Sequence, residues 1–224
     1  MLILRPYQID ALDAMDAHLI NDKTRSMCVE IPTGGGKSLI IASHIKRLLE
    51  KDPNLRICVV THRKELIQQN FDEFVKIAPE CQPGIFAANL GRKDFYHNIL
   101  FASIDSIYTK SHLIEKFDII YVDEAHRIPF KRNGKCYPRF IKDFQAKNPK
   151  MALIGLTATP YRDGYPLCHD SHFLQKLVYR ITLPELINDG FLCKLRTKSA
   201  NFKPDLSKVK ISKIDNDYDE KALS

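Results

Sequence analysis

Short apolar runs and longer segments of helical periodicity alternate along most of this chain. Hydrophobic residues recur at helical spacing directly after Ser38, and again from about Lys64 to Ile77. Strands that alternate with helices predict an α/β fold, in which helices flank a doubly wound, mostly parallel sheet. The predicted strands are Ser26–Ile31, Leu55–Val60, Ile99–Ala102, Phe117–Val122 and Met151–Leu156.

Two features interrupt this pattern. Pro79, Pro83 and Gly84 follow the second periodic helix and end it. From Asn201 onward the sequence is polar, mixed in charge and without periodicity, which is typical of a linker or of an extension that packs only when the rest of a larger protein is present. We therefore divide the chain into an α/β domain over residues 1–200 and a linker or extension over residues 201–224.

A glycine-rich loop joins the first predicted strand to the first periodic helix, with the sequence Ile31-Pro32-Thr33-Gly34-Gly35-Gly36-Lys37-Ser38. Three successive glycines let backbone N–H groups curl around phosphate oxygens, and the following helix points its positive end at the same anion. Lys37 would reach the β- and γ-phosphates, and Ser38 Oγ would bind Mg²⁺. An ordinary glycine-rich turn is the alternative. Ile31 stands where the usual pattern has glycine, at a position that does not hold phosphate.

Two adjacent carboxylates, Asp123 and Glu124, follow the continuous apolar run Phe117–Val122. Such a run is typical of a central parallel strand, and ligands bind at the carboxyl ends of these strands. Asp123 would hold Mg²⁺, and Glu124 would orient and deprotonate an attacking water. A solvated turn is the alternative. Together with the loop, the pair predicts a site for a magnesium–nucleoside triphosphate.

Six segments, in a fixed order, resemble the first-domain motifs of superfamily-two helicases and translocases. Thr33–Ser38 resembles motif I, and Asp123-Glu124-Ala125-His126 resembles motif II, the DEAH box. The other four are Leu4–Gln8 (the adenine-reading motif), Thr61–Leu66 (motif Ia), Phe101–Ile104 (motif Ib) and Thr157–Pro160 (motif III). The resemblance covers roughly residues 1–165 and implies a RecA-like, P-loop domain that binds ATP and Mg²⁺.

The resemblance also implies roles for individual residues. Gln8 would bind adenine through its amide, and Arg5 would pack on the ring, although Pro6 also suits an ordinary helix start. The phosphate-binding loop would comprise Thr33, Gly34, Gly35, Gly36, Lys37 and Ser38.

Two further sets follow from the same motifs. The residues that couple the nucleotide site to nucleic acid and to a partner domain would be His126, Thr157 and Thr159. The residues that contact the phosphodiester backbone would be Thr61, His62, Arg63 and Ser103. For these last four, an ordinary loop-capping role is the alternative.

Motors of this kind hold ATP between two RecA-like domains, and the second domain supplies arginines to the transferred phosphoryl group. After Pro160 no second set of apolar strands and no Gly-Arg-rich motif follows. Because a missing arginine finger costs on the order of a thousandfold or more in turnover, we expect weak nucleotide binding and poor hydrolysis. The segment up to Leu183–Leu192 resembles RadD-type DNA-repair helicases and restriction-enzyme motors, which implies DNA as partner, with RNA as the alternative.

The net charge of +7 is concentrated between Arg127 and Lys150, where eight Lys or Arg accompany a single acid, Asp143. Aromatic residues are interleaved with these cations, a mixture suited to nucleic acid. Their helical spacing favours a core role instead, with only the basic face available to nucleic acid. The residues at that spacing are Tyr137, Phe140, Ile141 and Phe144.

Six scattered cysteines are typical of a reduced, cytoplasmic protein rather than of a disulfide framework. The run Cys168–His172 invites a zinc interpretation, but it lacks a second ligand pair at finger spacing, so we expect a polar loop and no structural zinc. No stretch reaches the length of a membrane span, and the N-terminus lacks the layout of a signal peptide. We therefore expect no membrane partner.

Three functions compete. The leading one is the first domain of an ATP-dependent motor on nucleic acid, in DNA repair or processing. A small-molecule kinase is disfavoured, because the chain carries Asp123–His126 and Thr157–Pro160 rather than a lid and substrate acids. A nucleotide-gated nucleic-acid-binding module without turnover is the non-enzymatic alternative.

Overall fold

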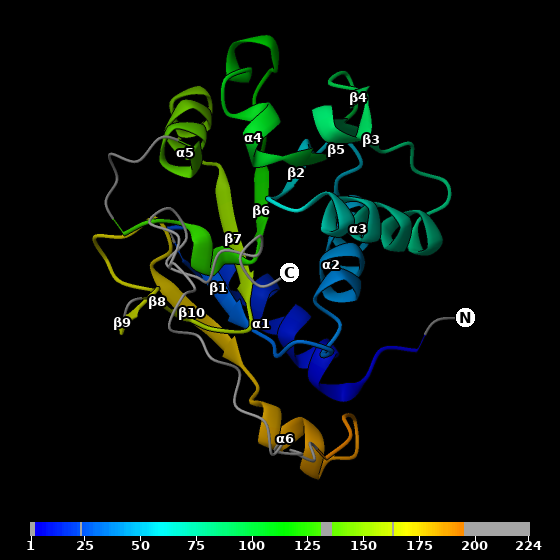
Figure 1. Ribbon diagram of the computed structural model, residues 1–224, viewed down its shortest axis with the longest axis vertical. Coiled ribbons are helices and arrows are strands. Elements are labelled where there is room, and N and C mark those ends of the chain that lie inside the picture. Colours follow the sequence, from blue (N-terminus) through cyan, green and yellow to red (C-terminus); the bar gives the residue numbers. More distant parts are fainter. Residues whose placement is uncertain (1–2, 23, 131–135, 163, 195–224) are drawn as a thin grey trace, which may run out of the picture. The chain divides into compact units, whose positions relative to one another are not determined.

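The computed structural model describes residues 3–22, 24–130, 136–162 and 164–194 (Figure 1). The chain divides into a compact unit, Met1–Leu192, and a second unit, Cys193–Ser224. The predicted linker, residues 201–224, and three cations of the basic segment lie outside the described residues. These cations are Lys131, Arg132 and Lys135.

The compact unit is built on an eight-stranded sheet with the order β10-β1-β7-β6-β2-β5-β3-β4. Every neighbouring pair is parallel except β3 with β4, so the predicted α/β, mostly parallel fold is confirmed. The strands of this sheet are β1 (Ser26–Glu30), β2 (Ile57–Thr61), β3 (Gly84–Ala87), β4 (Arg92–Lys93), β5 (Ile99–Ser103), β6 (Ile119–Asp123), β7 (Ala152–Thr157) and β10 (Lys176–Arg180). A separate antiparallel pair consists of β8 (Tyr161–Arg162) and β9 (Tyr165–Pro166).

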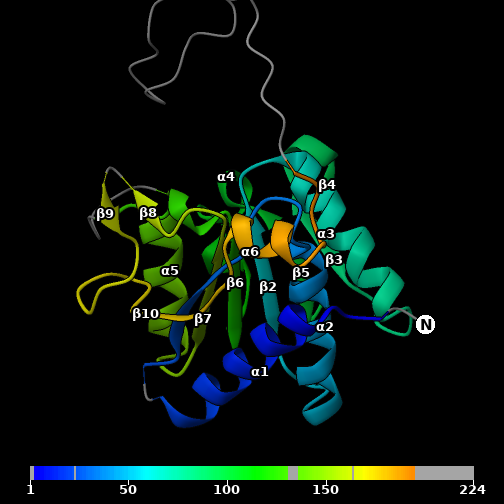
Figure 2. The ribbon, with the colours of Figure 1, turned by 90° about the horizontal axis from the view of Figure 1, so that it is seen from below.

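Helices cover both faces of the sheet, as a doubly wound fold requires. Figure 2 shows α5 on the opposite side of the sheet from α1 and α2. The α-helices are α1 (Pro6–Asn21), α2 (Lys37–Lys51), α3 (Lys64–Ile77), α4 (Ile104–Ile107), α5 (Cys136–Lys147) and α6 (Leu183–Asn188). Short 3₁₀ turns are η1 (Ala88–Leu90), η2 (Ser111–Leu113) and η3 (Ala125–Arg127). None of the helices in the described ranges combines the length and apolar character needed to cross a bilayer.

Successive strand residues enter two separate hydrophobic cores, one on each face of the sheet. In β6, Tyr121 packs with α1, α2 and α3, whereas Ile120 and Val122 pack with α4 and α5. This explains why the strands read as continuous apolar runs, since both faces are buried. The predicted core role of the aromatic stripe in α5 is confirmed for Tyr137, Phe140, Ile141 and Phe144.

Element bounds follow the sequence pattern where an element is central and depart from it at the edges. Helix α3 spans the predicted Lys64–Ile77, whereas the strand expected from Leu55 begins only at Ile57. Strand β10 was not predicted. It is an edge strand whose side chains are exposed or half-buried, so it lacks the apolar run that marks a central strand.

Candidate nucleotide-binding site

The glycine-rich loop connects β1 to α2 at the carboxyl edge of the sheet. Gly34 and Gly36 have φ angles of +83° and +82°, a region that glycine adopts without strain. Gly35 is restricted by space, because an added Cβ would lie 2.6 Å from Ile31 Cγ2. Ile31 is fully buried, so it packs in the core and supports the loop from below.

The segment predicted to read adenine starts helix α1 and touches the loop. Arg5 is the N-cap and Pro6 the first helical residue, so the helix-start interpretation is confirmed. Gln8 is buried: its Oε1 accepts a hydrogen bond from Arg5 N at 2.9 Å, and its Nε2 lies 3.4 Å from the Gly35 carbonyl oxygen. Both interpretations of this segment are therefore compatible.

Sequence reasoning gave no role to Tyr7 and Phe191, which join this segment to the chain beyond α6. Tyr7 Oη donates to the Gly35 carbonyl at 2.9 Å, and its ring centroid is 5.2 Å from that of Phe191. The Arg5 guanidinium lies 5.2 Å from the same Phe191 ring and donates to the Phe191 carbonyl. The loop is thus braced by aromatic side chains from both ends of the compact unit.

Asp123 and Glu124 emerge at the carboxyl end of β6. Asp123 is 1% exposed; its Oδ2 accepts from Asn70 Nδ2 and its Oδ1 from the backbone N–H of Glu124, both at 3.0 Å. Burial raises the pKa of Asp123, and the Asn70 hydrogen bond opposes that rise. Glu124 has a φ of +59°, a left-handed conformation that costs about 1–2 kcal/mol for a residue with a Cβ. Such strain is concentrated at functional sites.

Motifs I and II meet in this structure. Lys37 Nζ lies 3.5 Å from Glu124 Oε1, and both side chains are largely buried. Ser38 Oγ, in the first turn of α2, accepts a hydrogen bond from Gln69 Nε2 at 3.2 Å. Ser38 and Asp123 offer a hydroxyl and a carboxylate oxygen, the hard donors that Mg²⁺ prefers, so the residues present fit this ion.

A chain of contacts leads from the acids to motif III. His126 Nδ1 lies 3.3 Å from Glu124 Oε2 and 3.1 Å from Thr157 Oγ1. Thr157 Oγ1 accepts in turn from the Thr159 backbone N–H at 3.1 Å. Burial lowers the pKa of His126. The three residues predicted to couple the nucleotide site to its partners therefore form one hydrogen-bonded group beside Glu124.

The residues predicted to bind nucleic acid divide into two pairs. Thr61 and Ser103 face each other across β2 and β5, and both side chains are buried. His62 and Arg63 follow β2 and line a hollow of about 440 Å³ together with Glu124, His126 and Arg127. Burial, with Arg127 and Arg63 nearby, lowers the pKa of His62 to about 4. Phosphodiester contact by all four residues stays a prediction.

The run proposed for zinc lies after β9. His169 Nδ1 is 2.9 Å from Ser171 Oγ, and His172 Nδ1 is 3.1 Å from the Leu167 carbonyl oxygen. Within the described ranges, no three His, Cys, Asp or Glu side chains are grouped to hold a metal.

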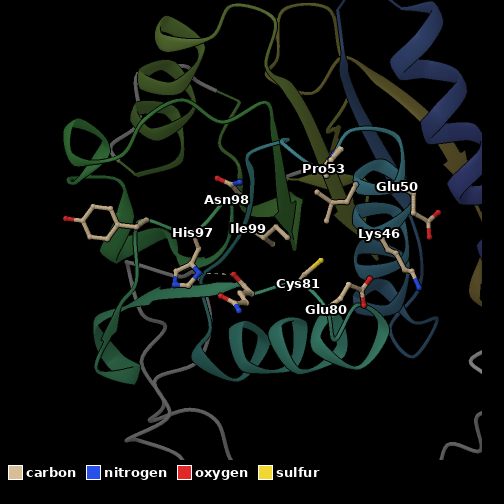
Figure 3. Close-up of a pocket in the computed structure, with 11 residues that line it drawn as sticks. Lys46, Glu50, Pro53, Glu80, Cys81, His97, Asn98 and Ile99 are labelled. Atoms are coloured by element: carbon tan, nitrogen blue, oxygen red, sulfur yellow. Dashed lines mark hydrogen bonds between the residues drawn. The ribbon is translucent and has the colours of Figure 1, made fainter.

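Another pocket, of about 480 Å³, lies at the opposite edge of the sheet (Figure 3). His97 and Ile99 border it near the amino end of β5, Cys81 lies before β3, and Lys46 and Glu50 come from α2. The motifs lie at the carboxyl ends of the strands, so this pocket takes no part in the nucleotide site.

A glycine-rich loop between β1 and α2, with an acid pair at the end of β6 of a mostly parallel sheet, defines a RecA-like P-loop nucleotide-binding domain. Residues 1–162 match the family described as "Type III restriction enzyme, res subunit". The chain belongs to this family, and its resemblance to the first domain of superfamily-two helicases is confirmed.

Curated relatives extend well beyond this chain. It is 30% identical over 221 residues to "Putative ATP-dependent helicase IRC3" of Saccharomyces cerevisiae, an alignment that covers 93% of this chain and 30% of that protein. It is 28% identical to "Putative mitochondrial ATP-dependent helicase irc3" of Schizosaccharomyces pombe, covering 92% of this chain and 34% of that protein. The chain thus spans about a third of the length of these relatives.

Solved structures share the fold at low identity. The Type ISP restriction-modification enzyme LlaGI, solved as a nuclease-deletion mutant with a DNA substrate mimic, superposes with a TM-score of 0.62 at 16% identity, over 92% of this chain and 22% of that one. The UvsW helicase from bacteriophage T4 superposes with a TM-score of 0.60 at 18% identity, over 80% of this chain and 61% of that one. These two structures show the shared fold. The restriction-enzyme side of the predicted resemblance is confirmed by the family match over residues 1–162, and the RadD-type likeness stays a prediction.

Proposed function

We propose that this chain is the ATP-binding part of an ATP-dependent helicase or translocase that acts on single-stranded or duplex DNA, in DNA repair or processing. One observation carries the proposal: Lys37, from the start of α2, lies 3.5 Å from Glu124, from the end of β6. This places the phosphate-binding cation beside the candidate base. The names of the relatives, which include two ATP-dependent helicases, support the same activity.

The chemistry assigned to the chain follows from this arrangement. The loop N–H groups and Lys37 would bind the β- and γ-phosphates, and Arg5 and Gln8 would select adenine. Ser38 and Asp123 would hold Mg²⁺, which when bound would offset the negative charge of the phosphates. Glu124 would then orient water and accept its proton. Its short link to His126 provides a path by which motif III can respond to the phosphates.

Partners and compartment belong to the proposal as well. DNA is favoured because LlaGI was solved in complex with a DNA substrate mimic and the Type ISP enzyme LlaBIII was solved bound to DNA. A second RecA-like domain would supply the arginine finger. Six cysteines scattered along the chain are typical of a protein from a reducing compartment such as the cytoplasm. The name of the Schizosaccharomyces pombe relative places that protein in mitochondria.

The decisive experiment compares the wild-type chain with Lys37→Ala and Glu124→Gln. Lys37→Ala should lose nucleotide binding, because it removes the cation that meets the phosphates. Glu124→Gln should keep binding and lose about a hundredfold or more of its hydrolysis, since it removes a general base. Nucleotide affinity is measured by fluorescence and turnover by phosphate release, with and without single- and double-stranded DNA and RNA.

The outcomes separate the candidate functions. Hydrolysis that depends on Lys37 and rises with DNA supports the motor. Affinity for single strands that changes with a non-hydrolysable ATP analogue, without any turnover, supports the nucleotide-gated module instead. Nucleotide affinity unchanged in Lys37→Ala would refute both.

A further inference from the structure

Two adjacent amides of helix α3 contact the two candidate metal ligands. Gln69 Nε2 donates to Ser38 Oγ at 3.2 Å, and Asn70 Nδ2 donates to Asp123 Oδ2 at 3.0 Å. Ser38 comes from α2 and Asp123 from β6, so the third element, α3, holds both ligands at once. Neither amide belongs to the residues predicted from the motifs.

The contact between Asn70 and Asp123 is buried, and among the described residues it leaves the other polar atom of the amide without a partner. Asn70 and Asp123 are each 1% exposed, and Asn70 Oδ1 has no hydrogen-bond partner within the described part of the chain. A buried polar atom without a partner carries a free-energy cost, so the amide is not placed there merely to satisfy its own groups. Its NH₂ group instead fixes one oxygen of Asp123, while the Glu124 N–H fixes the other.

The chemistry of each contact leaves the ligand atoms able to bind a cation. A hydroxyl oxygen has two lone pairs and a carboxylate oxygen likewise has more than one acceptor site. Accepting one N–H therefore orients Ser38 Oγ and Asp123 Oδ2 without exhausting them. Hydrogen bonds of this kind to metal ligands are conventional orienting devices, and losing one costs about 10–100-fold in metal affinity.

Helix α3 is itself firmly held, as an orienting element must be. Phe71 and Phe74 pack on Phe101 of β5, each with ring centroids 5.8 Å apart. Ile67 and Phe74 are almost fully buried in the core shared with α1 and α2. This packing fixes the part of α3 from which Gln69 and Asn70 project.

From these contacts we infer that Gln69 and Asn70 are positioning residues for Mg²⁺, acting through Ser38 and Asp123. This inference rests on the proposed nucleotide function and extends it from the ligands to the element that orients them. It assigns the helix after motif Ia a part in assembling the metal site. Their removal should weaken the Mg²⁺-dependent component of nucleotide affinity and leave the Mg²⁺-independent component in place.

The test uses the near-isosteric substitutions Gln69→Met and Asn70→Leu, which keep side-chain volume and remove the donor. Affinity for a fluorescent ADP is titrated over a series of Mg²⁺ concentrations and in EDTA. Each variant should need about 10–100-fold more Mg²⁺ for half-saturation, with affinity in EDTA unchanged within about twofold. The matched control is Gln68→Met on the same helix, since Gln68 is exposed and its Nε2 donates to Asp72 of the same helix rather than to a candidate metal ligand.

Other outcomes would overturn the inference. One is a wild-type Mg²⁺ requirement in both variants. Another is an equal loss of ADP affinity with and without Mg²⁺, because such a loss indicates a merely structural role. If Asn70→Leu fails to fold, Gln69→Met at its exposed position decides the matter. Lys37→Ala distinguishes failure of this inference from failure of the proposed function. If Lys37→Ala keeps its nucleotide affinity, the proposed function fails. If Lys37→Ala loses nucleotide affinity while the Gln69 and Asn70 variants keep the wild-type Mg²⁺ dependence, only the roles of Gln69 and Asn70 are refuted.

Discussion

Four histidines of the compact unit have a pKa below the ordinary value of 6.5, and in each case burial is the largest cause. His44 is fully buried between two partners: Nδ1 lies 2.7 Å from Tyr121 Oη, and Nε2 lies 3.4 Å from Asp16 Oδ1. Asp16 does not offset the loss of water around the ring. The set comprises His18, His44, His62 and His126.

This pattern makes stability depend on pH with a definite sign. Because the folded pKa of each histidine lies below its unfolded value, the unfolded chain binds more protons as the pH falls below about 6.5. We therefore predict that the melting temperature falls between pH 7 and pH 5. A decrease of about 1 kcal/mol in the free energy of unfolding lowers the melting temperature by roughly 2–4 °C for a chain of this size. Differential scanning fluorimetry across this range measures the effect.

His44→Gln should flatten this dependence, since an amide can bond Tyr121 and Asp16 without titrating. His112→Gln, at an exposed position, is the control and should leave the pH profile as it is. A melting temperature that is level from pH 7 to pH 5 in the wild-type chain would contradict the prediction.

Among the elements, strand β7 packs closely against η3, and this packing determines the position of motif II, the segment Asp123–His126. Gly155 lies in β7, between β1 and β6, and an added Cβ would stand 2.8 Å from Ala125 Cβ and 2.6 Å from Leu174 Cδ1. Ala125 directly follows Glu124. The absence of a side chain at Gly155 thus sets how closely the turn that carries Glu124 packs on the sheet.

Gly155→Ala should therefore destabilise the domain by about 1–3 kcal/mol through overpacking. It should also reduce turnover more than nucleotide affinity, because Ala125 and Glu124 must move while the glycine-rich loop does not. Urea denaturation and steady-state kinetics measure the two effects. Gly164→Ala is the comparison, since no atom lies within 4 Å of its added Cβ and only its φ of +81° adds strain. Equal effects of the two substitutions on turnover would refute the packing argument.

At the scale of the whole molecule, the described nucleotide site lies at the carboxyl edge of a single sheet. Lys37, Glu124 and His126 form one connected group there. Motors of this class complete such a site with cations from a second domain. The chain covers about a third of the length of its curated relatives.

We accordingly predict that the chain by itself binds ATP and hydrolyses it slowly. Because the arginine finger of such a site would come from a second domain, turnover by residues 1–224 alone should be lower by about a thousandfold or more than that of a two-domain helicase of the same family. The measurement is steady-state phosphate release by both proteins under the same conditions, with saturating DNA. Brisk turnover by this chain would overturn the prediction and point to an arginine supplied within it or by another copy.

Much of the fold could be read from local pattern, because central strands and amphipathic helices carry their own signature. The run before Asp123 indicated β6, and the periodicity of Lys64–Ile77 gave the bounds of α3. Strand β10 could not be predicted, because an edge strand lacks the continuous apolar run of a central strand. The sequence gives one weak indication of the role of Asn70, which is a polar residue in the apolar stripe that includes Ile67 and Phe74. Nothing in the sequence identifies its hydrogen-bond partner.

The amino-acid sequence alone predicts the chemistry of this protein: a glycine-rich loop for phosphate, an acid pair, and the strands and helices that carry them. These depend on residue type and short spacing, which act within a few positions of the chain. Only the tertiary structure shows which side chains orient the candidate ligands Ser38 and Asp123. Gln69 meets Ser38 across 31 positions, and Asn70 meets Asp123 across 53. Such pairs arise only when the packing of helices on a twisted sheet brings distant segments together, and no local pattern encodes that geometry.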